Sequence, residues 1–302
     1  MAIEFPDIPL DAWRPTKNTL HLYAQIVGKI RLAMHPRINH WWHVTLYVSP
    51  RGLTTRAIPH SVGNFEIEFD FKDHKLGMRT SDGRVEDFAL YDGLTVADFY
   101  ASVMANLAKL GIEPKIRAEP YDSISKTPFA EDTEHGSYDK EYIERAHNVL
   151  VAVDDIFEEF RGRFTGKSTP VHVFWHSFDL ALTRFSGKPA PPMPEANMVT
   201  REAYSHEVIS FGFWFGDDKE GGVPAPAFYS YAAPEPAGLA EERLPAPASW
   251  QEAGASHMAL LMYEDVRTAE NPRDKVLDFL ESAYQAGAKR AGWDAESFRL
   301  TA

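Results

Sequence analysis

The chain contains no cysteine, no long apolar run and no cluster of basic residues. Without cysteine it can form neither disulfides nor thiolate metal sites, and it has no cysteine nucleophile. No apolar run approaches the roughly 18 residues that a transmembrane helix requires. The net charge of −13 repels nucleic acid and anionic membrane surfaces. We therefore predict that the chain binds neither.

Motifs of several enzyme classes are also missing. There is no G-x-S-x-G, no glycine-rich phosphate loop, no Rossmann fingerprint and no H-E-x-x-H. The templates for hydrolases, NTPases, dinucleotide-binding proteins and zincins therefore fail, and no motif implies a cofactor. The acidic, proline-punctuated start does not resemble a secretory signal. Together with the lack of cysteine, it predicts a cytoplasmic protein.

What the chain does contain is enough apolar material for a folded core. Its 302 residues are 44% hydrophobic and 13% aromatic, and 25% are charged. These proportions are typical of globular proteins and exclude wholesale disorder.

The first half of the chain predicts a helix, a set of strands and a second helix. Apolar residues at helical spacing indicate a helix over 16–34, which Pro36 ends. The segment from Phe65 to Phe71 alternates apolar with acidic residues, which is typical of a strand with one face in water. Thr95 predicts the N-cap of a helix that ends at Gly111.

The second half predicts the same order of elements. A helix is expected over 139–161, followed by one aromatic strand over 172–185 and by further strands. Asn271 is expected to cap the last helix, with Pro272 at its first position.

The two halves also match in letters, which indicates an internal duplication. DFYASVMANLAK (98–109) aligns without gaps with DFLESAYQAGAK (278–289), and five of the twelve positions are identical. We predict an α+β fold in which two diverged helix–antiparallel meander–helix units pack as a pseudo-two-fold assembly. Residues 1–121 would form the first repeat, 122–137 a connecting loop and 138–302 the second repeat. The proline-rich segments 187–194 and 234–249 would be insertions, and the two repeats would form one compact unit.

Three strings give the chain a resemblance to a known family. They are HWWHVTLYVSPRGLTT, FWHSFDLALTRFSG and EAYSHEVISFGFWFG. With their spacing, they resemble an uncharacterised bacterial family that is catalogued only as a domain of unknown function. The resemblance extends from Trp13 to Trp293 and implies no activity, cofactor or catalytic residue. In that family the position of His176 is often glycine, which argues against a metal role for His176.

The densest group of chemically capable side chains lies in the predicted aromatic strand. On one regular strand, His172, His176 and Arg184 would project to one face, and Asp179 to the other. His172 and His176 without a nearby carboxylate are a weak signal for a metal site. A hydrogen-bonded structural role explains either histidine better.

Arg184 requires a partner if its strand is buried. Asp179 or Glu207 could pair with it structurally, and we favour that interpretation. The alternative is a ligand carboxylate or phosphate, in which case Arg184 anchors a site.

Polar groups among aromatic residues recur on two other predicted strands. His206 shares a strand face with Trp214, whereas Glu207 points the other way. In the first repeat, His43 follows Trp41 and Trp42. Pseudo-symmetry would bring His43 and His172 into one cleft.

We therefore predict that a cleft between the repeats binds a small, partly aromatic or anionic molecule. The predicted ligand-binding residues are His43, Trp41, Trp175, Asp179, Arg184, His206, Glu207 and Trp214. If the protein is an enzyme, histidine general acid/base chemistry is expected, with His172, His206 and Arg184 as candidates. Two alternatives stay open. One is a protein-interaction or scaffold role for the proline-rich segments, and the other is a histidine-based metal-dependent enzyme. The sequence does not decide between a monomer and a homo-oligomer.

Overall fold

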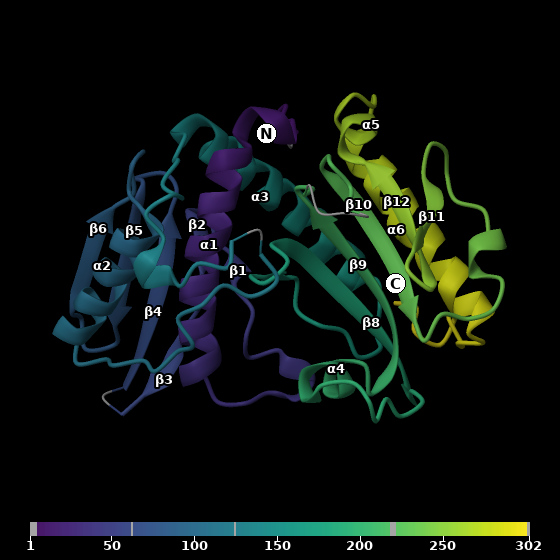
Figure 1. Ribbon diagram of the computed structural model, residues 1–302. Helices are drawn as coiled ribbons and strands as arrows, with labels where there is room; N and C mark the ends of the chain where they lie inside the picture. The colour runs from purple at the N-terminus through teal and green to yellow at the C-terminus, as the bar shows by residue number, and fades with distance from the viewer. Residues whose placement is uncertain (1–4, 62, 124, 218–221, 301–302) are drawn as a thin grey trace.

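The computed structural model describes residues 5–61, 63–123, 125–217 and 222–300 (Figure 1). These residues form six α-helices and two antiparallel sheets of six strands each, which confirms the predicted α+β class. The elements of the first half are α1 (Leu10–Met34), the 3-10 turn η1 (Asn39–Trp41), β1 (Tyr47–Val48), β2 (Gly52–Thr54), β3 (Ile58–His60), β4 (Gly63–Asp70), β5 (Lys75–Thr80), β6 (Val85–Ala89) and α2 (Val96–Lys109). Those of the second half are η2 (Phe129–Glu131), α3 (Lys140–Gly162), β7 (His172–Phe174), β8 (Asp179–Pro189), α4 (Met198–Ala203), β9 (His206–Trp214), β10 (Ala227–Ala233), η3 (Leu239–Glu241), β11 (Ser249–Ala253), β12 (Ser256–Met262), α5 (Tyr263–Arg267) and α6 (Pro272–Arg290).

The two sheets adjoin at one point. The first has the strand order β1-β2-β4-β5-β6, with β3 paired to β4, and the second has the order β11-β12-β10-β9-β8-β7. Leu46, just before β1, exchanges two backbone hydrogen bonds of 2.9 and 2.8 Å with Val173 of β7. The halves are therefore joined edge to edge. Figure 1 shows α1 and α3 near the middle of the molecule, with α2 and α6 towards its opposite ends.

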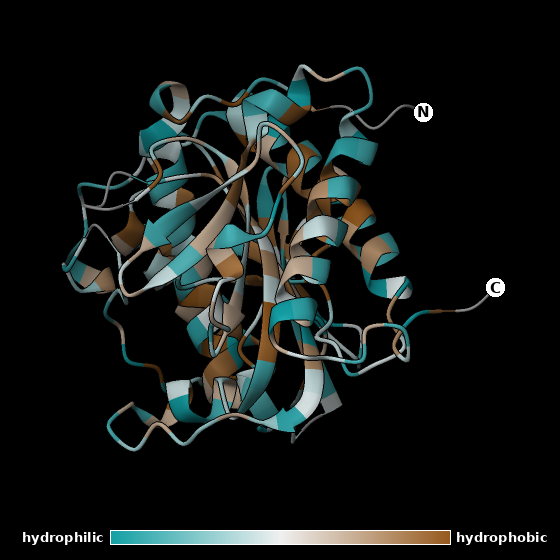
Figure 2. Cartoon of the chain, turned by 90° about the vertical axis from the view of Figure 1, so that its right-hand side faces the viewer, coloured by the Kyte–Doolittle hydropathy of each residue, from teal (hydrophilic) through white to brown (hydrophobic). Residues whose placement is uncertain are grey.

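The first sheet packs against α1 and α2 through aromatic stacking. The ring of Phe99 on α2 lies 3.9 Å from that of Tyr23 on α1 and 6.1 Å from that of Phe69 on β4. Phe65, Ile67, Phe69 and Phe71 are buried, whereas Glu66 and Glu68 are partly exposed, as their alternation predicts. In Figure 2 the hydrophobic segments gather in the interior of the molecule.

The second sheet carries helices on one face. Phe160 of α3 packs edge-on against Phe211 of β9 with ring centroids 4.9 Å apart. On α6, Gly287 lets Ile209 approach closely, because a Cβ there would lie 2.8 Å from its Cδ1. The opposite face of this sheet turns towards α1 and η1, and the main cavity of the protein lies there.

The predicted helix ends are confirmed where the sequence supplies a cap. The Thr95 hydroxyl accepts the Asp98 N–H at 3.0 Å, and the Asn271 side chain accepts the Asp274 N–H at 3.3 Å. The first helix, however, begins at Leu10 rather than near residue 16, and it includes Pro15. Burial of Leu10 and of Trp13, which packs edge-on against Phe215 at 5.1 Å, offsets the hydrogen bond that Pro15 cannot make.

The prediction of one aromatic strand over 172–185 is wrong. The segment forms a hairpin instead, in which β7 and β8 pair across the turn 175–178. Phe178 has a φ of 58°, and its ring stacks on His21 of α1 at 5.3 Å. This packing against α1 offsets the cost of a left-handed phenylalanine.

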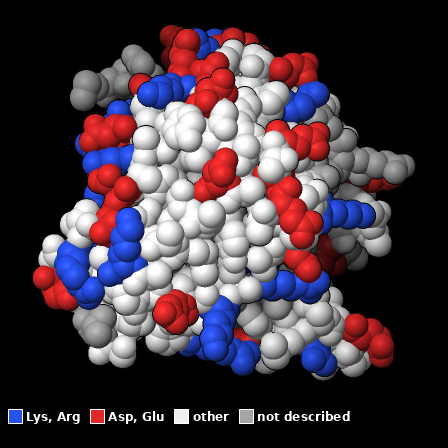
Figure 3. Space-filling view, turned by 60° about the vertical axis from the view of Figure 1, so that its left-hand side comes forward, with Lys and Arg blue, Asp and Glu red and all other residues white. Residues whose placement is uncertain are grey.

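The surface carries charges of both signs side by side. On the face in Figure 3, lysine and arginine lie among aspartate and glutamate rather than in a separate basic patch. None of the helices among the described residues is long and apolar enough to cross a membrane.

Candidate functional site

A cavity of about 1110 Å³ lies between the open face of the second sheet and the N-terminal half of the chain. Its floor consists of alternate residues of β8, β9 and β10, as expected for one face of a sheet. The strand register places Asp179 beside Trp214, and Thr183 beside Ser210 and then Tyr231. The walls are α1, η1, the segment 121–123, the turn 174–177 and α4.

Buried hydroxyl groups and one carboxylate make up the polar part of the floor. Asp179 accepts hydrogen bonds from the hydroxyls of Tyr229 and Ser177. The hydroxyls of Tyr204 and Tyr231 lie 2.9 Å apart. Burial raises the pKa of Tyr229 and of Tyr231 well above its ordinary value, and the charge of Asp179 raises the pKa of Tyr229 further. Both phenols are therefore neutral at physiological pH.

We expect Tyr229→Phe to destabilise the protein more than Tyr231→Phe. Loss of a donor to the buried Asp179 carboxylate costs about 1.5–3 kcal/mol of unfolding free energy, against about 0.5–1.5 kcal/mol for a bond between neutral groups. Urea unfolding of both variants measures the difference. Equal losses would contradict the assignment of Tyr229 as a donor to a charged Asp179.

One wall of the cavity depends on a glycine of α1. The indole of Trp175 lies across Gly28, where a Cβ would come within 2.1 Å of its Cδ1. The same indole donates from Nε1 to the carbonyl oxygen of Val44 at 2.7 Å. Trp175 is therefore fixed between α1 and the segment before β1.

Lys29 is the cation of this wall. Its ammonium lies 5.6 Å from the centroid of the Trp175 ring, and the residue is only 8% exposed. Burial lowers the pKa of Lys29, and Arg117 lowers it further. Among the described residues no carboxylate forms an ion pair with it. Burial removes the ammonium from water, which penalises its charge, and the face of an aromatic ring compensates only part of that cost. An anion bound beside the ammonium would compensate the rest.

The mouth of the cavity is built on strained backbone. His40 and Trp41 have φ values of 55° and 62°, which place both in the left-handed region. The Nε2 of His40 accepts from the Lys167 ammonium at 2.8 Å, so its Nδ1 donates to the Glu202 carbonyl oxygen at 3.0 Å. Burial lowers the pKa of His40, and the charge of Lys167 lowers it further. A neutral His40 thus ties η1 to α4.

Four of the predicted ligand-binding residues line this cavity. They are Trp41, Trp175, Asp179 and Trp214.

The other predicted residues lie elsewhere. His43 is buried beside Trp41, and its Nδ1 accepts the Ile38 N–H at 3.2 Å. His206 does not line the cavity; its ring packs edge-on against that of His40, with centroids 5.5 Å apart. Glu207 accepts the Trp293 indole N–H at 3.0 Å.

His172 does not line the cavity. It pairs with Ala181 in the hairpin, but its imidazole is 0% exposed and its Nδ1 lies 3.3 Å from the Thr45 hydroxyl. The segments that carry His43 and His172 pair at Leu46 and Val173. Neither histidine lines the cavity, because both are buried. His176 contributes to the cavity wall. Among the described residues, no group of three or more histidine, aspartate or glutamate side chains is placed to bind a metal ion.

Arg184 lies on the opposite face of the sheet. Its guanidinium donates to the carbonyl oxygen of Phe160 on α3. The predicted ion pair with Asp179 or Glu207 is wrong, because both carboxylates are bonded to other partners.

The comparisons with known proteins agree with the resemblance of the three strings. The model of a family of unknown function (DUF5996) matches residues 5–300. The chain belongs to this family. Neither a curated protein nor a solved structure matches the chain. The function of this DUF5996 protein must therefore be inferred from its own side chains.

The sequence prediction missed several residues of the cavity. They are Lys17, His21, Lys29, His40, Tyr229 and Tyr231. A signal for two of them is present, because Tyr229 and Tyr231 alternate with Ser230 and so share one strand face.

The proline-rich segments differ in their surroundings. Residues 187–194 are mostly exposed. Residues 234–249 instead pack along α6, where Glu242 accepts from Lys289 at 2.9 Å and from Arg290 at 2.6 Å. This contact reduces the surface that the second segment could offer a partner.

Proposed function

We propose that this protein binds a small organic anion with an aromatic or flat apolar body in the cavity between its halves. The observation that carries the proposal is Lys29, a buried ammonium in the cavity wall with no carboxylate partner among the described residues. A ligand carboxylate or phosphate would complete this wall by forming a charge-assisted hydrogen bond.

The shape and chemistry of the remaining walls support a flat ligand body. Trp41, Trp175 and Trp214 line the cavity together with Phe174 and Phe185. Aromatic walls of this kind bury flat molecules well, and a few polar groups then fix their orientation. Tyr229, Tyr231 and Asp179 supply such groups on the floor.

A matched pair of variants tests the anchoring role of Lys29. A panel of aromatic carboxylates, each paired with its alcohol (for example indole-3-acetate and indole-3-ethanol), is first screened by thermal shift. For carboxylates that bind, Lys29→Met should weaken the affinity at least tenfold, which is about 1.4 kcal/mol. The exposed Lys109→Met on α2 should leave it unchanged. Calorimetric titration measures both.

Two outcomes contradict the proposal. One is that the alcohols stabilise the protein as well as the carboxylates do. The other is that Lys29→Met binds the carboxylates with unchanged affinity.

We also propose that the two halves, 1–121 and 138–302, descend from one duplicated unit, with 122–137 as the connection. If β3 and β11 are additions, the remaining strands follow the same meander order in each sheet, and each meander lies between two helices. The identities between 98–109 and 278–289 support this origin. We expect a sequence profile of the family's first half to detect its second half, and failure to do so would count against duplication.

A further inference from the structure

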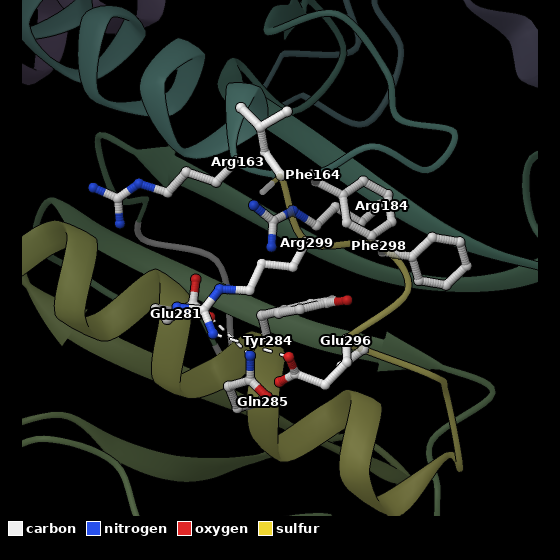
Figure 4. A pocket seen from close by; sticks show the side chains of 11 residues that line it. Arg163, Phe164, Arg184, Glu281, Tyr284, Gln285, Glu296, Phe298 and Arg299 are labelled. Atoms are coloured by element: carbon white, nitrogen blue, oxygen red, sulfur yellow. Dashed lines mark hydrogen bonds and ion pairs between the residues drawn. The ribbon is translucent and has the colours of Figure 1, made fainter. Parts of the chain in front are cut away.

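A second cavity, of about 450 Å³, lies on the helix-covered face of the second sheet (Figure 4). It opens between the end of α3, strand β8, helix α6 and the segment 295–300. Since the main cavity lies on the other face of the same sheet, the two are separate.

The deepest polar group of this cavity is Arg184. The residue is 2% exposed, and its guanidinium carbon lies 3.6, 4.9 and 4.5 Å from the ring centroids of Phe160, Phe164 and Tyr284. One Nη donates to the Phe160 carbonyl oxygen, whereas Nε has no hydrogen-bond partner. Within the described ranges no carboxylate forms an ion pair with it. Burial lowers the pKa of Arg184 to about 10, so the group stays charged at neutral pH.

A second unpaired group lines the same space. The Tyr284 hydroxyl is buried and has no hydrogen-bond partner. Burial raises the pKa of Tyr284, so the phenol keeps its proton and needs an acceptor. Figure 4 shows the Arg184 guanidinium extending over the Tyr284 ring into the middle of the cavity.

The rim carries charges of both signs. Arg163 and Arg299 line the cavity together with Glu281 and Glu296. Arg163 pairs with Glu159 at 2.6 Å, and Arg299 lies 3.9 Å from Glu296. Of the three guanidinium groups that line the cavity, that of Arg184 has no ion pair within the described residues, so the innermost charge is positive. Glu281 accepts from Gln285 at 2.8 Å and raises the pKa of Arg184 without forming an ion pair. The electrostatics therefore favour an anion at the inner end.

We propose that this cavity is a second ligand site, which binds a carboxylate or phosphate group attached to a small apolar or planar body. The anion would accept from Arg184 and Tyr284, which are the two groups with unused donors. Phe164 and Phe298 would contact the apolar body. Arginine suits this role because its planar fork matches both oxyanions.

Thermal unfolding of the full chain with benzoate, phenyl phosphate and neutral benzyl alcohol tests the proposal. All samples have equal ionic strength, adjusted with sodium chloride. At least one of the two anions should raise Tm in a saturable manner, and benzyl alcohol should not. A shift with benzoate alone assigns a carboxylate, and a shift with phenyl phosphate alone assigns a phosphate.

Variants separate this site from the main cavity. In the Lys29→Met background, which lacks the anion anchor of the main cavity, Arg184→Met keeps the length of the side chain without its charge and should abolish the saturable shift. Tyr284→Phe, which removes only the hydroxyl, should raise the half-saturating concentration at least threefold. Lys29→Met alone should keep a saturable shift, reduced only by the part that binding in the main cavity contributes. If Arg184→Met does not fold, Tyr284→Phe and Arg299→Gln provide the comparison.

Three outcomes would overturn the proposal. One is the absence of any shift beyond that of sodium chloride, and another is an unchanged shift in both Arg184→Met and Tyr284→Phe, each measured in the Lys29→Met background. A shift that disappears only in Lys29→Met would place the anion in the main cavity and refute this site while supporting that one.

Discussion

Replacing Gly28 with alanine is expected to destabilise the protein by about 1–3 kcal/mol, although alanine is the better helix former. On helix propensity alone, the change would stabilise α1 by up to about 1 kcal/mol. Sterics oppose it, because the new Cβ would lie 2.1 Å from Cδ1 and 2.2 Å from Cγ of Trp175. The indole is also tied to Val44, so it cannot move without losing a hydrogen bond. Urea unfolding measures the sign of the effect.

A matched glycine supplies the control. Gly162 is the last residue of α3, and a Cβ there would meet no atom within 4 Å. Gly162→Ala should therefore be neutral or slightly stabilising. In Gly28→Ala the displaced Trp175 should also abolish binding of aromatic carboxylates in the main cavity. If Gly28→Ala is as stable as Gly162→Ala, the close contact between α1 and Trp175 is wrong.

Acid should destabilise the protein steeply below pH 6.5, and His172 should be a main cause. Its imidazole is completely buried, which lowers the pKa of His172 from 6.5 to about 3, with the charges of Arg31 and Arg56 adding to the effect. The imidazole is neutral in the folded protein, whereas in the unfolded chain it binds a proton below pH 6.5. Stability is therefore lost as the pH falls from 6.5 towards 3.

The size of the effect follows from this difference in pKa. Between pH 7 and pH 5, His172 alone should cost about 2 kcal/mol of unfolding free energy. His172→Asn places an amide, which can donate or accept a hydrogen bond, near the Thr45 hydroxyl and removes the titrating ring. The decrease in stability between pH 7 and pH 5, measured by urea unfolding, should be about 2 kcal/mol smaller in this variant.

Thr45→Val serves as the control for the pH effect. It removes the hydroxyl that lies 3.3 Å from Nδ1 but keeps the buried imidazole. The pH dependence of Thr45→Val should match that of the unmodified protein. Other buried histidines with lowered pKa, such as His40 and His147, contribute equally to all three proteins. If the pH dependence of His172→Asn equals that of the unmodified protein, burial does not lower the pKa of His172 in the folded protein, and this prediction is wrong.

The sequence could predict Asp179 as a site residue. It could not predict on which face of the sheet His172 and Arg184 lie relative to Asp179. Counting along one strand places His172 and Arg184 together and Asp179 opposite. The hairpin instead pairs His172 with Ala181, so His172 shares its face with Asp179 and Thr183. Arg184 turns to the helices. One short turn thus inverts the alternation, and it depends on a left-handed Phe178 that no local pattern indicates.

The α1 wall of the site was harder to predict, although its spacing carries a signal. Lys17, His21, Gln25 and Lys29 recur every four residues, so they form one polar stripe on the helix. All four are buried, and three of them line the main cavity. From the sequence alone, such a stripe is expected to face water. Only the packing of the turn 174–177 and the segment 121–123 over it makes it part of an enclosed site.

A crystal structure of the protein soaked with an aromatic carboxylate that stabilises it would test the central proposal most directly. We predict density for the ligand between Trp175 and Trp214, with its carboxylate within hydrogen-bond distance of Lys29 Nζ. The absence of ligand density from this cavity would contradict the proposal. So would a carboxylate in the cavity that points away from Lys29.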